Sequence, residues 1–466
     1  MGPNTNDRAM MKRLAEEGMN IARFNFSHGS HEEQKGRMDL LKSVREEIGK
    51  PIAILLDTKG PEIRTGLLKD GKKVKLEAGE LFTLTTEEIE GDARKVSITY
   101  DGLAEPGKRI LIDDGLIELE VKTISGSEIT CKVLNGGELG ERKGVNVPNV
   151  PVRLPALTKK DREDIIFGVE QGIDFIAASF VRSAEGILEI RALLKECGAP
   201  YIPIIAKIES AEGIKNIDEI IHCADGIMVA RGDLGVEIPA EKVPYLQKML
   251  IKKCNDNYKP VITATQMLDS MIRNPRPTRA EVTDVANAVY DGTDAVMLSG
   301  ETAQGKYPAE ALQMMVHIIE NTEKHLDYDV LLEKAQEHRK KGISSAIGYS
   351  SVATAMNLSA KCIITPSVTG ATARVVSKFK PKADIIGVTP CEETLRRMQI
   401  YWGVTPVKSI EYNTTEDICN DAIDLVTAKR LVEPGDIVVM TAGIPSPTIK
   451  KSRDGVTNMM RIAVVE

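Results

Sequence analysis

The sequence predicts an α/β protein in three parts: a (β/α)8 TIM barrel, a small β-barrel lid domain inserted in it, and a C-terminal open-sheet α/β domain. Short apolar runs alternate with amphipathic segments of helical length, which is the pattern of β/α units around a parallel sheet. A block inside this series has alternating segments and turn signals instead. A fresh set of β/α units follows residue 330. We expect the barrel at 1–65 and 154–330, the lid at 66–153 and the C-terminal domain at 331–466.

Composition narrows the class of protein. The 466 residues are 42% hydrophobic and 28% charged, with a net charge of −7, which disfavours a nucleic-acid or membrane-surface role but allows anionic metabolites. The seven cysteines include no Cys-x-x-Cys pair, so we expect reduced thiols in the cytosol. No apolar run reaches membrane-spanning length, and the N-terminus lacks the apolar core of a signal peptide. These features predict a cytoplasmic protein.

Seven apolar runs are the expected barrel strands: 19–27, 51–59, 173–181, 202–210, 224–233, 259–267 and 293–301. Each is followed by polar or charged residues, and in an α/β barrel the carboxyl ends of the strands gather at the face that carries the active site. The residues at this edge are Arg23, Asn25, Asp57, Lys59, Lys207, Glu209, Asp233, Thr265 and Ser299. Packing of the core does not explain so many polar and charged residues at the strand ends, and they indicate a functional site.

The other segments follow in chain order. Residues 109–122 (RILIDDGLIELEVK) predict a hairpin of the lid, and Thr158-x-x-Asp161 predicts the capped start of the helix after it. Thr278-x-x-Glu281 predicts a second capped helix, with Arg276 and Arg279 on its solvated start. The C-terminal strands are expected within 360–367, 383–390 and 435–443.

Lys207, Glu209 and Asp233 carry the main chemical hypothesis. Lys207 and Glu209 lie two apart on one expected strand, hence on one face, and Asp233 ends the next strand. Two carboxylates suit a hard divalent cation such as Mg²⁺, and a lysine beside them can neutralise a transferring phosphoryl group. A single Lys–Glu pair is more often structural, but three such groups on adjacent strand ends favour metal-dependent phosphoryl transfer.

A second cluster lies in ARFNFSHG and LLDTKGPEIRTG. Asn25, Ser27, Asp57 and the Thr58 carbonyl offer oxygens that suit a monovalent cation. The nearby basic residues that would attract phosphates are Arg23, Lys59 and Arg64. Taken singly, Ser27 and His28 are ordinary loop residues. No His-Asp-Ser or Cys-His arrangement supports nucleophilic catalysis.

The order of the motifs resembles one enzyme family. ARFNFSHG, LLDTKGPEIRTG, IIAKIES, MVARGDLGVEIP, TATQMLDSM, NPRPTRAE and MLSGET occur in the order found in pyruvate kinases, and the resemblance covers practically the whole chain. It implies transfer of the phosphoryl group of phosphoenolpyruvate to ADP, followed by protonation of the enolate to pyruvate.

The resemblance also implies roles for single residues. Glu209 and Asp233 would hold Mg²⁺ (or Mn²⁺), and Lys207 and Arg23 would act on the phosphoryl group. Gly232, Asp233 and Thr265 would bind the substrate carboxylate, and Thr265 would help to position the proton donor, with Ser299 and Glu301 in the same network. The expected K⁺ ligands are Asn25, Ser27, Asp57 and Thr58, and the expected nucleotide contacts are Pro3, Asn25, His28 and Arg64. Glu62 stands where a glutamate accompanies potassium dependence in this family.

The C-terminal domain of the family carries a sugar-phosphate pocket. SVTGATARVV (367–376) follows an expected strand and opens a helix, so Ser367, Thr369, Gly370 and Thr372 are candidates for binding a phosphorylated-metabolite effector. An ordinary capped loop is the alternative. The resemblance further implies a homotetramer.

Two departures from the family pattern stand out. Ser183 occupies a position that is usually basic, which puts one nucleotide contact in doubt. The family begins with a strand that runs into the Gly2-Pro3 turn, and only Met1 precedes that turn here. We expect that adding an apolar strand before Gly2 raises thermal stability and activity, since a barrel one strand short exposes unpaired edges; equal melting temperature and turnover would contradict this.

Two other readings remain open from the residues. One is a lyase or aldolase that forms an enolate on the same metal pair; the lid and the phosphate-attracting cluster argue against it. The other is a weakly catalytic protein that senses phosphosugars, against which the intact set of Lys207, Glu209, Asp233 and Thr265 argues.

Overall fold

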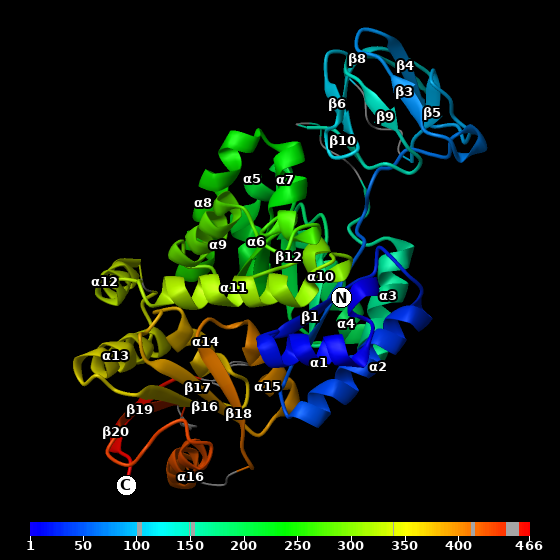
Figure 1. Cartoon of the computed structure of the whole chain (residues 1–466). Helices are drawn as coiled ribbons and strands as arrows, with labels where there is room; N and C mark the ends of the chain where they lie inside the picture. Colours follow the sequence, from blue (N-terminus) through cyan, green and yellow to red (C-terminus); the bar gives the residue numbers. More distant parts are fainter. Residues whose placement is uncertain (100–104, 149, 151–153, 339, 412–414, 444–455) are drawn as a thin grey trace.

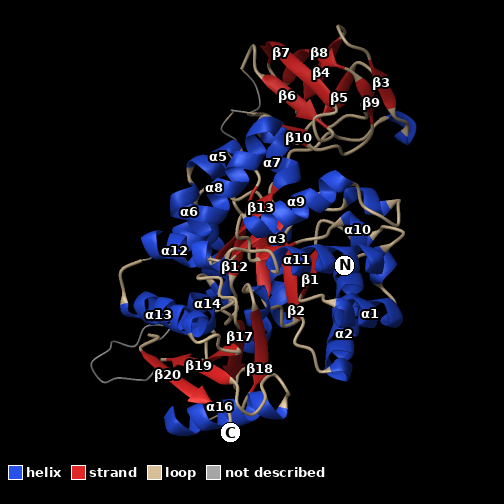
Figure 2. Ribbon diagram, turned by 60° about the vertical axis from the view of Figure 1, so that its left-hand side comes forward, coloured by secondary structure: helices blue, strands red, loops and turns tan. Residues whose placement is uncertain are grey.

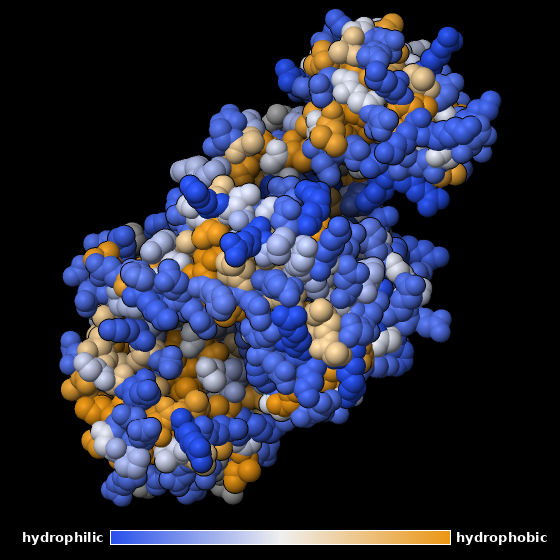
Figure 3. Space-filling model, viewed as in Figure 1, coloured by the Kyte–Doolittle hydropathy of each residue, from blue (hydrophilic) through white to orange (hydrophobic). Residues whose placement is uncertain are grey.

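The computed structural model describes residues 1–99, 105–148, 150, 154–338, 340–411, 415–443 and 456–466. Its three parts lie in a row: the lid at one end, the barrel in the middle and the C-terminal domain at the other end (Figures 1 and 2). Figure 3 shows a mostly hydrophilic face with hydrophobic residues gathered over part of the C-terminal domain. In the described part of the chain, no helix combines the length and apolar character needed to span a membrane.

The barrel sheet has seven parallel strands in the order β1-β2-β11-β12-β13-β14-β15. Their bounds are β1 Ile21–Asn25, β2 Ala53–Asp57, β11 Phe175–Ala178, β12 Ile204–Ile208, β13 Gly226–Ala230, β14 Val261–Ala264 and β15 Ala295–Val296. Each lies inside one of the seven predicted apolar runs, which confirms them. β1 and β15 end this sheet, so the described strands number seven where a closed TIM barrel has eight.

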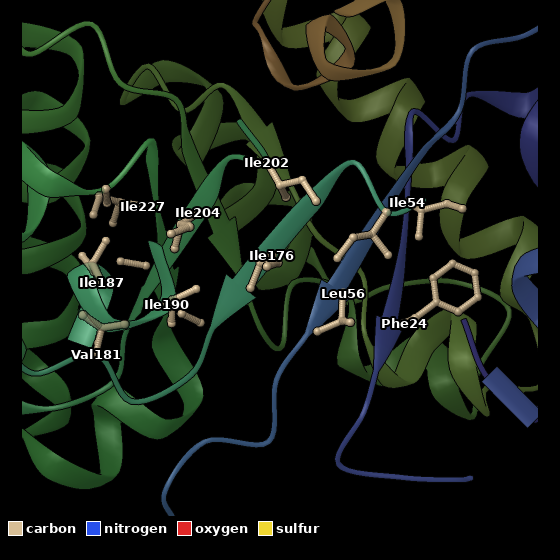
Figure 4. Close-up of a cluster of buried hydrophobic side chains, with 14 of the residues drawn as sticks. Phe24, Ile54, Leu56, Ile176, Val181, Ile187, Ile190, Ile202, Ile204 and Ile227 are labelled. Carbon is tan, nitrogen blue, oxygen red and sulfur yellow. The ribbon is translucent and has the colours of Figure 1, made fainter. Parts of the chain in front are cut away.

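Alternate residues of each strand face opposite sides of the sheet, as a pleated strand requires. The outward set packs in one cluster under the helices; Figure 4 shows Phe24, Ile54, Leu56, Ile176 and Ile204 from four neighbouring strands. The inward set, which includes Leu55, Phe175, Ile205 and Met228, forms a second cluster inside the curved sheet. This alternation decides which polar residues point into the barrel.

The helices of the barrel domain lie around the sheet (Figure 1). They are α1 Arg8–Glu17, α2 His31–Ile48, α3 Lys159–Glu170, α4 Ala184–Glu196, α5 Ala211–Lys215, α6 Ile217–Cys223, α7 Arg231–Glu237, α8 Val243–Asp256, α9 Arg279–Tyr290, α10 Gly300–Ala303 and α11 Pro308–Glu323. The short helices α5, α7 and α10 follow the carboxyl ends of β12, β13 and β15. Short 3-10 turns lie at Pro3–Thr5, Ala240–Lys242 and Asp269–Ile272. Thr158 and Thr278 form the predicted capping boxes of α3 and α9.

The lid contains two small sheets around a core of its own. The strands are β3 Val74–Leu76, β4 Leu81–Thr85, β5 Lys95–Ser97, β6 Arg109–Ile112, β7 Ile117–Ser125, β8 Glu128–Asn135, β9 Gly137–Leu139 and β10 Val145–Asn146. β6 and β7 pair antiparallel, which confirms the hairpin predicted over 109–122. The Asn146 amide contacts Glu237 of α7 at 3.0 Å and so links the lid to the barrel.

The C-terminal domain is an open sheet in the order β18-β17-β16-β19-β20. Its elements are α12 Tyr328–His338, α13 Ile343–Asn357, β16 Cys362–Pro366, α14 Ala371–Ser377, β17 Asp384–Thr389, α15 Glu392–Arg397, β18 Val404–Lys408, α16 Thr415–Ala428, β19 Ile437–Ala442 and β20 Met459–Val464. The three predicted strands are β16, β17 and β19. β18 and β20 were not predicted, because they lie at the two edges of the sheet, are largely unburied and lack a continuous apolar run.

Buried ion pairs join this domain to the amino-terminal side of the barrel strands. Asp294, just before β15, pairs with Lys378 and lies 3.3 Å from the ammonium of Lys380. Asp174, just before β11, accepts from Arg396 at 2.7 Å. Each aspartate also accepts a backbone N–H from a neighbouring strand. The two domains therefore meet on charged groups that belong to the ends of the sheet.

Candidate active site

The site forms at the ends of β1, β2 and β12, where the inward-facing residues of each strand change from apolar to polar. On β12 the inward-facing series runs from Ile205 to Lys207 and on to Glu209, and on β2 it ends at Asp57. Asn25 of β1 lies opposite Asp57 in the strand register. Because the strands are parallel, these side chains meet at one end of the barrel, as predicted.

Lys207 lies at the centre of this cluster. Its ammonium is 3.0 Å from Glu209 Oε1 and 3.2 Å from Asp57 Oδ1, and it donates to Ser179 Oγ at 2.7 Å. Arg23 pairs with the second oxygen of Asp57. The predicted cluster is therefore one connected network in which two cations alternate with two carboxylates.

The charges of this network are fixed by mutual pairing. Burial favours neutral Asp57, but the charges of Arg23 and Lys207 outweigh burial and hold the pKa of Asp57 below its usual range. Burial likewise opposes the charge of Lys207, yet Asp57 and Glu209 outweigh it and raise the pKa of Lys207 well above that of a free lysine. Lys207 is consequently a fixed positive charge at neutral pH.

Glu209 and Asp233 form the predicted metal pair. Glu209 is 1% exposed, and the backbone N–H of Phe180 donates to its Oε2 at 2.5 Å. Burial, followed by the negative charge of Glu209, raises the pKa of Asp233 to about 7. Two buried carboxylates held together in this way repel each other, which a divalent cation between them would relieve, and oxygen ligands of this type are those that Mg²⁺ takes from proteins. The residues present therefore fit a divalent ion, and other oxygens would complete its shell.

Thr265 and Gly232 meet at the neighbouring strand ends. The Gly232 N–H donates to Thr265 Oγ at 2.7 Å. Thr265 follows β14 directly, with a φ of +71°. Glu301 is 2% exposed and accepts from the backbone N–H groups of Leu268 (3.1 Å) and Ser299 (2.7 Å). Glu301 thereby ties the loop after β14 to the end of β15, next to the predicted substrate site.

The predicted potassium ligands lie together. Asn25 and Asp57 are register partners, and Thr58 follows Asp57. Asn25 Oδ1 accepts from the Ser27 N–H at 2.9 Å, and the Thr58 carbonyl accepts from Ser179 Oγ at 2.6 Å. The Asn25 amide, the Asp57 carboxylate and the Thr58 carbonyl thus lie at neighbouring strand ends, and these oxygens fit a monovalent cation.

The predicted nucleotide residues lie more widely spread. Arg64 pairs with Glu62 at 2.6 Å and lines a cavity of about 670 Å³ between lid and barrel, together with Glu209 and Asp233. His28 is exposed in the loop after β1. Pro3 begins the 3-10 turn that packs against α10. The cavity therefore connects Arg64 with the metal pair, while Pro3 and His28 lie outside its lining.

The predicted effector residues surround the start of α14. Ser367 Oγ accepts from the Gly370 N–H at 3.0 Å, and Thr372 Oγ lies 2.9 Å from Thr457 Oγ. Thr369 is exposed. Ser367 and Thr372 already have protein partners, so the local geometry agrees equally with an ordinary capped loop.

Sequence reasoning missed Ser179, which bridges Lys207, Asp57 and the Thr58 carbonyl. A signal was present: Phe175, Ala177 and Ser179 alternate, so Ser179 continues the inward face just past β11. A serine after an apolar run is common, however, and only the neighbouring strands show that its hydroxyl meets a lysine.

Comparisons with known proteins agree with this geometry. The family model for the pyruvate kinase barrel domain matches residues 1–312, and the model for the pyruvate kinase alpha/beta domain matches residues 345–463. A pyruvate kinase of Clostridium acetobutylicum is 49% identical over 470 aligned residues, which cover 100% of this chain and 98% of that protein. A pyruvate kinase of Geobacillus stearothermophilus is 51% identical, with coverage of 100% and 79%.

A solved structure gives the same result. The crystal structure of a pyruvate kinase from Cryptosporidium parvum matches with a TM-score of 0.93 and 40% identity, covering 100% of this chain and 95% of that one. Two family models together span most of the sequence, and the relatives align over its whole length. The chain belongs to the pyruvate kinase family of enzymes.

Proposed function

We propose that this enzyme transfers the phosphoryl group of phosphoenolpyruvate to ADP, forming ATP and, after protonation of the enolate, pyruvate. The observation that carries the proposal is the network of Arg23, Asp57, Lys207 and Glu209 at the carboxyl ends of the strands. The family comparisons support the same reaction.

Lys207 and Arg23 supply the positive charges of the site, and carboxylates hold both of them in place. Lys207 is held by two carboxylates, so its ammonium stays in place and charged as negative charge moves between oxygens of the phosphoryl group. Arg23 of β1 adds a second cation through its pair with Asp57 of β2. Electrostatic stabilisation of this kind, together with positioning, is the main contribution that a protein makes to phosphoryl transfer.

Glu209 and Asp233 would hold Mg²⁺ or Mn²⁺, which supplies positive charge for the substrate oxygens when bound. The Gly232 N–H and the Thr265 hydroxyl lie beside them, where they are suited to bind the substrate carboxylate. Thr265 would then position the proton donor for the enolate carbon, and Glu301 would hold the loop that carries Thr265.

Asn25, Ser27, Asp57 and Thr58 would hold K⁺ next to Arg23. The nucleotide would lie under the lid with Arg64, and Pro3, Asn25 and His28 complete that proposed set. Binding of a phosphorylated-metabolite effector at Ser367, Thr369, Gly370 and Thr372, a homotetramer and a cytoplasmic location remain predictions from the sequence and the family resemblance.

A coupled assay of pyruvate formation tests the reaction. We expect pyruvate from phosphoenolpyruvate only when ADP, Mg²⁺ and K⁺ are all present. Pyruvate release without ADP would mean that water and not ADP accepts the phosphoryl group, and no product under any condition would favour a metabolite sensor. Either result would contradict the proposal.

Substitution of the metal pair tests the site. Glu209→Gln and Asp233→Asn keep the shape of each side chain but remove its charge, so we expect turnover to be lost and Mn²⁺ affinity to fall while the circular dichroism spectrum stays unchanged. Arg162→Gln is a control, because the Arg162 side chain is half exposed and its pair with Glu196, at 3.6 Å, lies on the surface. Near-normal turnover in either site variant would remove that residue from its role.

A further inference from the structure

We infer that Arg231 is a positioning residue for the protonation step: its guanidinium holds the backbone after β14 in the conformation that brings the Thr265 hydroxyl into the site. The inference rests on the role proposed above for Thr265. The role of Arg231 follows from the contacts of its guanidinium with the end of β14 and the loop after it, with α8 and with α9.

The loop that carries Thr265 is strained. β14 ends at Ala264, and the next two residues, Thr265 and Gln266, have φ values of +71° and +53°. Left-handed backbone is uncommon for any residue other than glycine, and a β-branched threonine there is an outlier. Such conformations cost about 1–3 kcal/mol each and persist only when surrounding groups hold them. The strain therefore requires a specific restraint.

Arg231 supplies that restraint. Its Nε donates to the Ala264 carbonyl at 3.2 Å, and its Nη2 donates to the Thr265 carbonyl at 2.8 Å. The planar guanidinium thus donates hydrogen bonds to two successive carbonyls at the point where the backbone turns. The adjacent Gly232 N–H donates to Thr265 Oγ, so two consecutive residues of α7 hold both the backbone and the hydroxyl of Thr265.

The other side of the guanidinium is anchored in the barrel wall. Nη1 of Arg231 lies 2.6 Å from Asp284 Oδ1 of α9 and 3.2 Å from Gln247 Oε1 of α8. The Arg231 side chain is 13% exposed. The Asp284 carboxylate and the Gln247 amide oxygen fix the orientation of the Arg231 guanidinium. The guanidinium in turn holds the carbonyls of Ala264 and Thr265 through its hydrogen bonds. Arg231 therefore acts on the reaction through Thr265.

Arg231→Gln is the first test. We expect kcat to fall about 100-fold, the size of effect that a misplacement of about 1 Å produces. The KM for phosphoenolpyruvate should rise as well, because Thr265 is also proposed to bind the substrate carboxylate. The affinity for Mn²⁺ should stay within about twofold, because Glu209 and Asp233 are unchanged. The exchange of pyruvate methyl protons with D₂O, followed by NMR with metal ions and nucleotide present, should fall in parallel with kcat. A purely structural role would instead change melting temperature and Mn²⁺ affinity.

A double-mutant cycle with Thr265→Ala is the decisive test. If Arg231 acts through Thr265, Arg231→Gln causes little further loss in the Thr265→Ala background, because residues that act as a unit are not additive. Asp284→Asn keeps the fold and weakens the same restraint, so we expect a drop in kcat of about 3–10-fold with the same non-additivity. Arg162→Gln should leave every readout unchanged.

The outcomes separate this inference from the proposed function. Full turnover in Thr265→Ala would remove the role proposed for Thr265. Impaired turnover in Thr265→Ala with independent, multiplicative losses from Arg231→Gln or Asp284→Asn would overturn the inference on Arg231 alone. Should Arg231→Gln fail to fold, the Asp284→Asn cycle decides by the same criterion.

Discussion

Asp294→Ala should loosen the C-terminal domain from the barrel. Asp294 has a fully buried side chain between two lysines of the C-terminal domain, Lys378 and Lys380, and it also accepts the Val261 N–H at 2.8 Å. The substitution leaves the lysine ammoniums without their buried carboxylate and removes the acceptor for the amide at the start of β14. All of these losses fall on the interface between the domains.

The contacts set the expected magnitude. Removing one partner of a buried ion pair costs about 3–5 kcal/mol, because the remaining charge is left without compensation. Burial already lowers the pKa of Lys380 to about 8, despite Asp294, so Lys380 can lose its proton and escape part of this cost. Lys378 is 1% exposed and carries the larger share. We therefore expect a loss of about 4 kcal/mol in the free energy of unfolding.

The chain contains a single tryptophan that reports on this interface. The Lys380 ammonium lies 5.1 Å from the ring centre of Trp402, which is 9% exposed. Urea unfolding followed by Trp402 fluorescence should shift to lower urea in Asp294→Ala. Glu392→Ala is the control, since its pair with Lys408 is largely exposed and worth less than about 1 kcal/mol. A loss below about 1 kcal/mol in Asp294→Ala would refute the reasoning.

Three further predictions concern single side chains. The pKa of Lys380 is about 8 in the folded state and 10.5 in the unfolded state, so the unfolded chain binds more protons between pH 8 and pH 10.5. The free energy of unfolding of the wild type, relative to that of Lys380→Met, should therefore rise with pH across this range. A difference in urea titrations that does not change with pH would contradict this. Ser179→Ala removes the acceptor of a hydrogen bond from Lys207, so kcat should fall at least about tenfold in the coupled assay. An unchanged kcat would show that the hydrogen bond between Lys207 and Ser179 does not contribute to catalysis. Thr278→Ala removes the cap of α9 and should lower the free energy of unfolding by about 1 kcal/mol, measured by urea titration; no change would mean that the cap adds nothing.

The barrel strands could be predicted because their signal is local. Each buried parallel strand is a short apolar run that is followed by polar residues. A stretch of consecutive residues therefore shows both the strand and the end that carries functional side chains. Lys207 and Glu209 were found in this way, and the structure joins them by an ion pair of 3.0 Å. The edge strands β18 and β20 were missed because they are largely unburied and therefore lack a continuous apolar run.

Ser179 and Arg231 show what no local pattern contains. Each is a common residue type in an ordinary position, and each becomes functional only through groups brought from other strands: Asp57 and Lys207 for Ser179, and the Thr265 carbonyl for Arg231. The strained φ of Thr265 is likewise invisible in the sequence, since nothing about threonine favours it.

The sequence by itself determined the class of chemistry, because strand periodicity and the order of the motifs place charged residues at the carboxyl ends of a parallel sheet. Only the tertiary structure decided the protonation and the geometry of that cluster. The pKa values of Lys207 and Asp233 depend on burial and on partners that lie on other strands, and the position of Thr265 depends on a guanidinium held from two helices. Electrostatic energy depends on distance and on exclusion of water, and both are set only when the strands meet.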